Sequence, residues 1–481
     1  MAVETANTGV FVGVGQPYWD NGVLNQITDI FVEALNNSTP LYGLVHKSPP
    51  KEMHGNFMTG LAHTTRGTGN NAVRVGGRLP DPDREGLSTW ISMPRNYFAT
   101  LKLQGDIVDR GTTNGGALVT ALSVETKAAM DNTRVDLNRQ LHNDGSGRLG
   151  MVASVSTTTI TLNINTDIEG AASVNTSTKR MGDRNFEVGM RVGFVTNNGA
   201  LTVAQTAAAP AGQKGYFVVA ATASTIQVAL TQGGAAHDVA GQTVAVAAGM
   251  WIFRCSTDGL GLTDLQFLQG SAFRSEIMGI GGILKDDGTI DGIGAAGAQQ
   301  TGALAADTGT TSTLFQGLAA TTANPFNRAI VIDNGGGGPR SVSFDLLQQL
   351  ISDFEETNNG DPKLMMSPHA PYNAWASIAH ADKRYNNTME LATGHKVLTF
   401  NGIPWWKDRT MYPGRVAVLD TDLLNWYEVR PFSPLSMGDG TVWQRIPNFE
   451  DFYMNYKGSG NLVVDGGPRN RVGAVLVDLF V

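Results

Sequence analysis

The residues able to carry out chemistry are few and scattered in this chain of 481 residues. Its single cysteine, Cys255, would need a positioned base to act as a nucleophile, and the sequence nominates none. We therefore expect Cys255 to be a small buried thiol. No GxSxG turn, HExxH pair or CxxC pair occurs, so no catalytic serine or metal-ligand set is predicted. The histidines share no compact spacing; they are His46, His54, His63, His142, His237, His369, His380 and His395.

One glycine-rich turn resembles a phosphate-binding loop. Residues 331–340, VIDNGGGGPR, place glycines between a predicted strand and a predicted helix, where backbone N–H groups can cradle a phosphate. The turn lacks the Lys-Ser/Thr pair of a P-loop and the spaced glycines of a dinucleotide-binding fold. A tight turn explains these glycines better than nucleotide binding.

Acidic and aromatic side chains raise two further possibilities, glycoside hydrolysis and sugar binding. Asp353 and Glu355 lie on the polar side of a predicted helix, where solvated charges are the default rather than a catalytic pair. Trp375, Trp405 and Trp406 could stack on a sugar or a base, but buried packing or an interface anchor is the simpler interpretation. We therefore expect no enzyme, no cofactor and no metal.

The composition favours a folded protein with many turns and large contacting surfaces. Glycine accounts for 58 residues, charged residues for only 16% and hydrophobic residues for 41%, and the formal net charge is −8. These values exclude a disordered chain and a basic coat for nucleic acid. A single cysteine, no secretory signal and no apolar run long enough to span a membrane predict folding in the cytoplasm.

The other elements must be arranged around one long amphipathic helix at residues 115–143. Its apolar side chains follow a helical period, and the sequence Asp144-Gly145-Ser146-Gly147 ends it. A helix of this length, about 40 Å, needs other elements along it. The residues of its apolar stripe are Leu118, Leu122, Ala129, Met130, Leu137 and Leu141.

Before this helix, residues 1–52 suggest an extended arm with a short helix at 23–35, and residues 53–107 suggest a long hairpin joined near 79–86. A two-stranded hairpin has almost no core, so it must lie against another surface. Charged residues gather toward its tip, and Trp90 lies in its second arm. The residues that we expect to make this contact are Arg66, Arg74, Arg78, Asp81, Asp83, Arg84, Glu85 and Trp90.

After the helix, residues 148–254 contain short β-type runs between turns and predict a small antiparallel sandwich or barrel, inserted into the rest. Residues 258–440 mix strands and helices, including a helix from Phe344 that is capped by Ser341 or Ser343. The final run, RVGAVLVDLFV, is apolar on both alternations except for one aspartate. It should therefore be a buried central strand.

In this order, the elements resemble the major capsid proteins of tailed double-stranded DNA bacteriophages, the Hong Kong 97 fold. The resemblance is carried by the hairpin sequence at 53–110 running into the helix, and by KLMMSPHAPYNAW, VLTFNGIPWWKDR and VGAVLVDLFV in the last third. It implies an α+β fold with an inserted all-β domain. The implied parts are an amino-terminal arm at 1–52, an extended loop at 53–107, a peripheral spine helix at 108–147, the insertion at 148–254, a mainly axial domain at 258–440 and a return to the peripheral domain at 441–481.

The resemblance also implies a function and partners. The chain would self-assemble as pentamers and hexamers into an icosahedral shell around double-stranded DNA, which it would bind without sequence specificity. The extended loop would lie across a neighbouring subunit. A separate scaffolding protein and a portal are implied, a decoration protein is compatible, and no membrane is involved. The location would be the virion capsid, after assembly in the host cytoplasm.

Two departures and two alternatives qualify this interpretation. Some members of the family cross-link through a lysine in the extended loop, but no lysine lies between Lys51 and Lys102, so cross-linking is not expected. No charge-rich scaffolding segment precedes the first helix, which favours a separate scaffolding protein. An encapsulin-like compartment shell has the same fold, and a β-rich carbohydrate-binding or tail protein would explain the threonine-rich region.

Overall fold

The computed structural model divides into two compact units, which are described separately below. The first unit comprises residues within Met1–Pro49, Pro94–Arg139 and Trp426–Asn461, and the second comprises Pro50–Met93, Gln140–Asn425 and Leu462–Val481. Among the described residues, no helix is both long and apolar enough to cross a membrane. The described residues are 40–55, 57–65, 72, 74–75, 77, 86–103, 115–162, 185–196, 202–207, 212–222, 224–240, 242–284, 314–316, 318–319, 327, 329–332, 334, 340–358, 360–381, 388–390, 396–436, 442–445, 450–465, 471–477 and 479.

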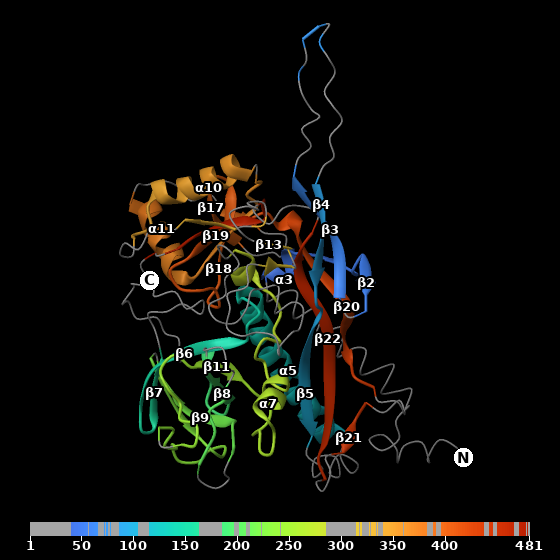
Figure 1. Ribbon diagram of the computed structural model, residues 1–481, viewed down its shortest axis with the longest axis vertical. Coiled ribbons are helices and arrows are strands. Elements are labelled where there is room, and N and C mark those ends of the chain that lie inside the picture. The colour runs from blue at the N-terminus through green and yellow to red at the C-terminus, as the bar shows by residue number, and fades with distance from the viewer. Residues whose placement is uncertain are drawn as a thin grey trace, which may run out of the picture. The chain divides into compact units, whose positions relative to one another are not determined.

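The first unit contains a five-stranded sheet (Figure 1), and aromatic side chains form its core. Its strands are β1 (His46–Ser48), β20 (Leu424–Pro434), β22 (Phe452–Val464), β21 (Gln444–Arg445) and β5 (Arg95–Leu103), and β5 runs antiparallel to β22. A short helix, α3 (Pro40–Leu44), precedes β1. The ring of Phe432 stacks on both Tyr97 and Tyr456, and Trp426 meets Tyr42 edge to face. These rings bury one face of the sheet.

The long helix is confirmed as α5 (Gly115–His142). Leu137 and Leu141 of its predicted stripe are buried, whereas the side chains of Leu118, Leu122 and Met130 lie outside the described part of the chain. The helix ends where the sequence predicts, because Gly145 and Gly147 adopt φ values of 78° and 73°, which residues with side chains rarely reach.

The second unit contains the base of the hairpin as a three-stranded sheet, β2 (Glu52–His54), β3 (Phe57–Thr65) and β4 (Gly86–Ser92). The expected second arm, continuous to residue 103, is divided. β4 pairs with β3, while β5 belongs to the five-stranded sheet of the first unit. Pro94 separates them, because it donates no ladder hydrogen bond and holds the preceding residue in an extended conformation. The arm at 1–20 and the short helix at 23–35 lie outside the described residues.

Residues between Arg148 and Arg254 form a closed barrel in the order β10-β7-β6-β11-β8-β9. Closure removes the free strand edges that an open sheet would expose. The barrel has a core of its own, which includes Val152, Ile160, Phe194, Tyr216 and Ile252, all fully buried. Its strands are β6 (Arg148–Ser156), β7 (Thr159–Leu162), β8 (Arg191–Val195), β9 (Tyr216–Ala221), β10 (Thr225–Ala229) and β11 (Trp251–Arg254).

A seven-stranded mixed sheet forms the other core of the second unit, in the order β14-β23-β19-β15-β18-β17-β16. Helix α10 (Phe344–Asn358) packs against it, and the Ser343 hydroxyl accepts a hydrogen bond from the Leu346 amide, so Ser343 is the cap. Helix α11 (His369–Ala381) follows β15. The strands are β14 (Ile330–Ile332), β23 (Gly473–Leu476), β19 (Val416–Leu419), β15 (Leu364–Ser367), β18 (Ile403–Lys407), β17 (Lys396–Phe400) and β16 (Thr388–Glu390).

The final strand, β23, lies between β14 and β19, and all four of its residues are buried, as the apolar final run predicts. Residues 441–481 do not return to a single region. Most of β22 belongs to the first unit, and β23 completes the seven-stranded sheet of the second. The apolar side chains on both faces of β23 explain its position, because only an interior strand is covered on both sides.

Candidate functional site

The hairpin sheet has one face packed on its own chain and one face turned outward. Met58, Trp90 and Ser92 are buried on the packed face. On the other face, Leu61 pairs with Thr89, and Leu87 lies two residues from Thr89 along β4. The side chains of Leu61 and Leu87 are 60% and 58% exposed. We call Leu61, Leu87 and Thr89 the outer face, and adjacent exposed leucines of this kind mark an interaction surface.

Trp90, which was expected at a subunit contact, is used inside its own chain. Its side chain is 1% exposed, and its indole N–H donates to Asp465 at 3.1 Å. Gly60 allows this packing, because a Cβ atom there would lie 2.5 Å from the Trp90 ring. Burial leaves the indole no surface for a neighbour. Arg74 is exposed, and the other expected tip residues, Arg66, Arg78, Asp81, Asp83, Arg84 and Glu85, lie outside the described residues.

A buried ion pair lies where the chain passes from α5 into β6, the first strand of the barrel. Asp144 and Arg148 are both 0% exposed and lie 2.5 Å apart. The Ser146 hydroxyl accepts from Arg148 Nε at 2.8 Å, and the guanidinium lies over the Trp251 ring of β11. Burial alone would raise the pKa of Asp144, but Arg148 and the hydrogen bonds from Ser146 and Arg148 hold that pKa below its ordinary value. From the sequence, residues 144–147 predicted only the end of the helix. The opposite charges of Asp144 and Arg148, four residues apart, were the signal for this ion pair that the sequence analysis missed.

The last turn of α5 is fixed by a second polar network. The Gln140 side chain accepts from the Ile277 amide at 3.3 Å, and the Tyr412 hydroxyl donates to the Asn143 side chain at 2.9 Å. Gly279 lies so close that a Cβ atom there would overlap the last helical carbonyls. The Gln140 carbonyl accepts from the Asn143 amide at 3.1 Å, and the close packing of Gly279 gives this end of the helix a rigid support.

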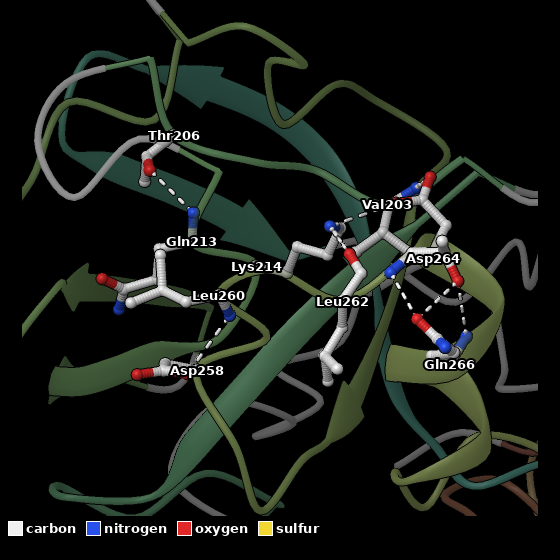
Figure 2. Close-up of polar contacts among 10 residues, drawn as sticks. Val203, Thr206, Gln213, Lys214, Asp258, Leu260, Leu262, Asp264 and Gln266 are labelled. Atoms are coloured by element: carbon white, nitrogen blue, oxygen red, sulfur yellow. Dashed lines mark hydrogen bonds and ion pairs between the residues drawn. The ribbon is translucent and has the colours of Figure 1, made fainter.

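The chain after the barrel continues to pack on the barrel. Figure 2 shows Lys214, which donates to the Leu262 carbonyl at 2.5 Å and lies 3.6 Å from the Asp264 carboxylate. The other oxygen of Asp264 accepts from the Val203 amide at 3.1 Å (Figure 2). Both contacts join residues 262–264 to loops of the barrel.

The next residues form helix α7 (Asp264–Gln269), which begins with a capping box between Thr263 and Gln266. Its Phe267 ring packs edge to face on Phe253 of β11. The Ala272 amide then donates to the Arg254 carbonyl at 2.9 Å. The packed unit therefore extends past the predicted boundary at 254 to about residue 272. This extension could not be predicted from the sequence, because the added segment has no strand pattern.

Three of the residues considered for chemistry, Cys255, Trp375 and Trp405, lie in packed environments. Cys255 is buried, and burial raises the pKa of its thiol to about 12. Trp405 is fully buried and donates to Ser367 at 2.8 Å, and Trp375 stacks on it. This geometry confirms aromatic packing for Trp375 and Trp405. Within the described ranges, no group of three or more His, Cys, Asp or Glu side chains could hold a metal ion.

The arrangement defines an α+β protein in which a hairpin sheet, a long helix and a closed barrel accompany a mixed sheet completed by the final strand. No protein-family model and no curated protein sequence matches this chain. Solved structures do match it. The capsid asymmetric unit of cyanophage A-1(L) is 10% identical with a TM-score of 0.44, and the match covers 92% of this chain and 93% of that chain.

Two further matches are also capsids. The capsid of a native GTA particle is 8% identical, with a TM-score of 0.39 and coverage of 92% of this chain and 90% of that chain. The satellite phage P4 procapsid is 9% identical, with a TM-score of 0.36 and coverage of 94% and 90%. An encapsulin complex from Synechococcus elongatus matches only 31% of this chain and 52% of that chain, with 15% identity and a TM-score of 0.24. The three capsid matches each cover at least 92% of this chain.

Proposed function

We propose that this chain is the major capsid subunit of a tailed double-stranded DNA bacteriophage. It assembles as pentamers and hexamers into an icosahedral shell that encloses the genome, and it is not an enzyme. One observation carries the proposal. The hairpin packs one face on its own chain and leaves Leu61 and Leu87 exposed on the other. A monomer gains nothing from this arrangement, whereas a second copy laid against the outer face would bury both leucines.

The parts of the subunit are assigned as follows. The hairpin within 53–107 is the extended loop, α5 is the peripheral spine, the seven-stranded sheet is the axial domain, and the barrel is an inserted domain. The charged tip residues Arg66, Arg74, Arg78, Asp81, Asp83, Arg84 and Glu85 remain proposed contacts with a neighbouring subunit. Trp90 is left out of that surface because its indole is buried.

The partners follow from this role. A separate scaffolding protein and a portal take part in assembly in the host cytoplasm, and a decoration protein is compatible with the exposed barrel. Double-stranded DNA is packaged without sequence recognition, which suits a chain of net charge −8.

Electron microscopy of the purified protein, expressed alone and with candidate scaffolding proteins, tests the proposal. We expect closed icosahedral shells. Only monomers or small rings under every condition would contradict it and favour the carbohydrate-binding alternative. Shells that enclose a protein cargo instead of DNA in their native host would favour the encapsulin-like alternative.

A further inference from the structure

A buried carboxylate, that of Asp465, lies at the base of the hairpin sheet. Asp465 directly follows β22, and its side chain is 4% exposed. Its amide donates to the Leu423 carbonyl at 3.3 Å, which ties it to the body of the second unit. A carboxylate buried to this extent is costly unless its oxygens have partners. Two of its partners come from the hairpin sheet.

The two carboxylate oxygens hold opposite edges of that sheet. Oδ1 accepts from the Trp90 indole of β4 at 3.1 Å. Oδ2 pairs at 2.6 Å with Lys51, the residue immediately before β2. Since the strand order is β2-β3-β4, the carboxylate links the two outer strands. A further hydrogen bond holds β4 next to Trp90, where the Ile91 amide donates to the Gln316 carbonyl at 2.8 Å.

The carboxylate links the strands at the base of the hairpin sheet, so a small rotation there changes the direction of the strands beyond it. β3 has nine residues, which corresponds to about 30 Å of extended chain. A rotation of about 10° at the base would displace the far end of such a strand by about 5 Å. Leu87 of the outer face lies three residues from Trp90 along β4, about 10 Å away, so the same rotation would displace it by about 2 Å. This exceeds the gap of about 0.5–1 Å over which apolar side chains stay in contact, so the outer face would be misplaced against any partner.

We propose that Asp465 is the positioning residue of the hairpin, and that its two bonds set the direction in which the outer face is presented to a neighbouring copy. This inference rests on the proposed capsid function. The carboxylate acts from inside its own subunit and touches no neighbour. Its loss should therefore change how subunits assemble more than whether they fold.

The test measures hydrogen exchange in unassembled subunits and shell yield by sedimentation and electron microscopy. Asp465→Ala should speed exchange about tenfold in both β2 and β4 and reduce shell yield several-fold or give shells of irregular curvature. Trp90→Phe should affect mainly β4, and Lys51→Met mainly β2, because each removes one bond. Lys102→Met is the matched control, since it removes an exposed lysine of β5, paired with Asp451 at 2.7 Å, outside the three-stranded sheet β2-β3-β4.

The outcomes separate this inference from the proposed function. If Asp465→Ala fails to fold, Asp465→Asn and Lys51→Met carry the test, because each keeps a group of similar size at its position. Normal exchange in β2 and β4, or normal shells from variants with faster exchange, would overturn the positioning role of Asp465. If the unmodified protein forms no shells, the capsid function fails, while the strand-specific exchange pattern still decides whether Asp465 fixes the hairpin.

Discussion

The buried pair between Asp144 and Arg148 provides the sharpest test of the energetics of this fold. Arg148→Met keeps most of the packing against Trp251 but leaves the Asp144 carboxylate in a fully buried site without its cation. Removing one member of a buried pair costs about 3–5 kcal/mol. The Ser146 amide still donates to Asp144 at 2.9 Å, so we expect a loss near the lower limit, about 3 kcal/mol, in urea unfolding at pH 7.

The matched control is Arg134→Met. Arg134 and Asp131 also form a pair, at 3.6 Å, but their side chains are 41% and 52% exposed. Solvent screens such a pair, so its loss should cost about 1 kcal/mol or less. The difference between the two variants isolates the effect of burial, because both remove one arginine from a pair with an aspartate close in sequence.

The pH dependence provides an independent check. In the native protein the pKa of Asp144 is lowered. The ionised carboxylate therefore stabilises the folded state above its pKa in the unfolded chain, about 3.9, and this contribution is lost as the pH falls through the pKa in the folded state. In Arg148→Met, burial without the cation should raise this pKa. The loss should then shrink by about 1.4 kcal/mol per pH unit as the pH falls from the raised pKa toward about 3.9. A loss equal to that of Arg134→Met, or one that does not change between pH 7 and pH 5, would refute the reasoning.

Three other predictions concern the hairpin and the thiol. Gly60→Ala places a methyl group against the Trp90 ring and should destabilise the hairpin base by about 1–3 kcal/mol, seen as faster exchange in β3 and β4 with the barrel unaffected. Leu61→Ser with Leu87→Ser should change subunit stability by about 0.5 kcal/mol or less yet abolish shells, whereas Leu265→Ser, at an exposed leucine on α7, should not; shells from the double variant would contradict the outer-face contact. Cys255 should react with a thiol reagent at pH 8 only as fast as the protein unfolds, because burial raises its pKa to about 12, and immediate labelling would contradict this.

Elements defined by local pattern were predictable from the sequence. The helical period and the glycine stop set the bounds of α5, the serine before Phe344 capped α10, and the apolar final run became the interior strand β23. Each of these depends on residues close together in the chain. Alternation within residues 148–254 predicted an all-β unit in the same way, although closure into a barrel depends on pairings between distant strands.

The missed features all depend on contacts between distant residues. Tryptophan is a residue type common at interfaces. Only the hydrogen bond of Trp90 to Asp465, 375 residues away, shows that this side chain is internal. The division between β4 and β5 depends on β5 finding β22 as its partner. The packing of residues 255–272 on the barrel depends on single contacts such as Lys214 with Leu262. None of these pairs leaves a periodic signal in the sequence.

The barrel and the hairpin sheet of the second unit are each held at their base by a buried carboxylate. At the barrel, Asp144 is buried against Arg148, and at the hairpin, Asp465 is buried against Trp90 and Lys51. Buried carboxylates contribute little net stability compared with apolar packing, but they tolerate few alternative geometries. Such groups suit elements that must keep a defined direction, as the proposed contact of the hairpin with a second copy requires. Exposed leucines at the hairpin and rigid polar contacts at its base are then complementary requirements, since an apolar surface binds a partner only where the base holds it in place.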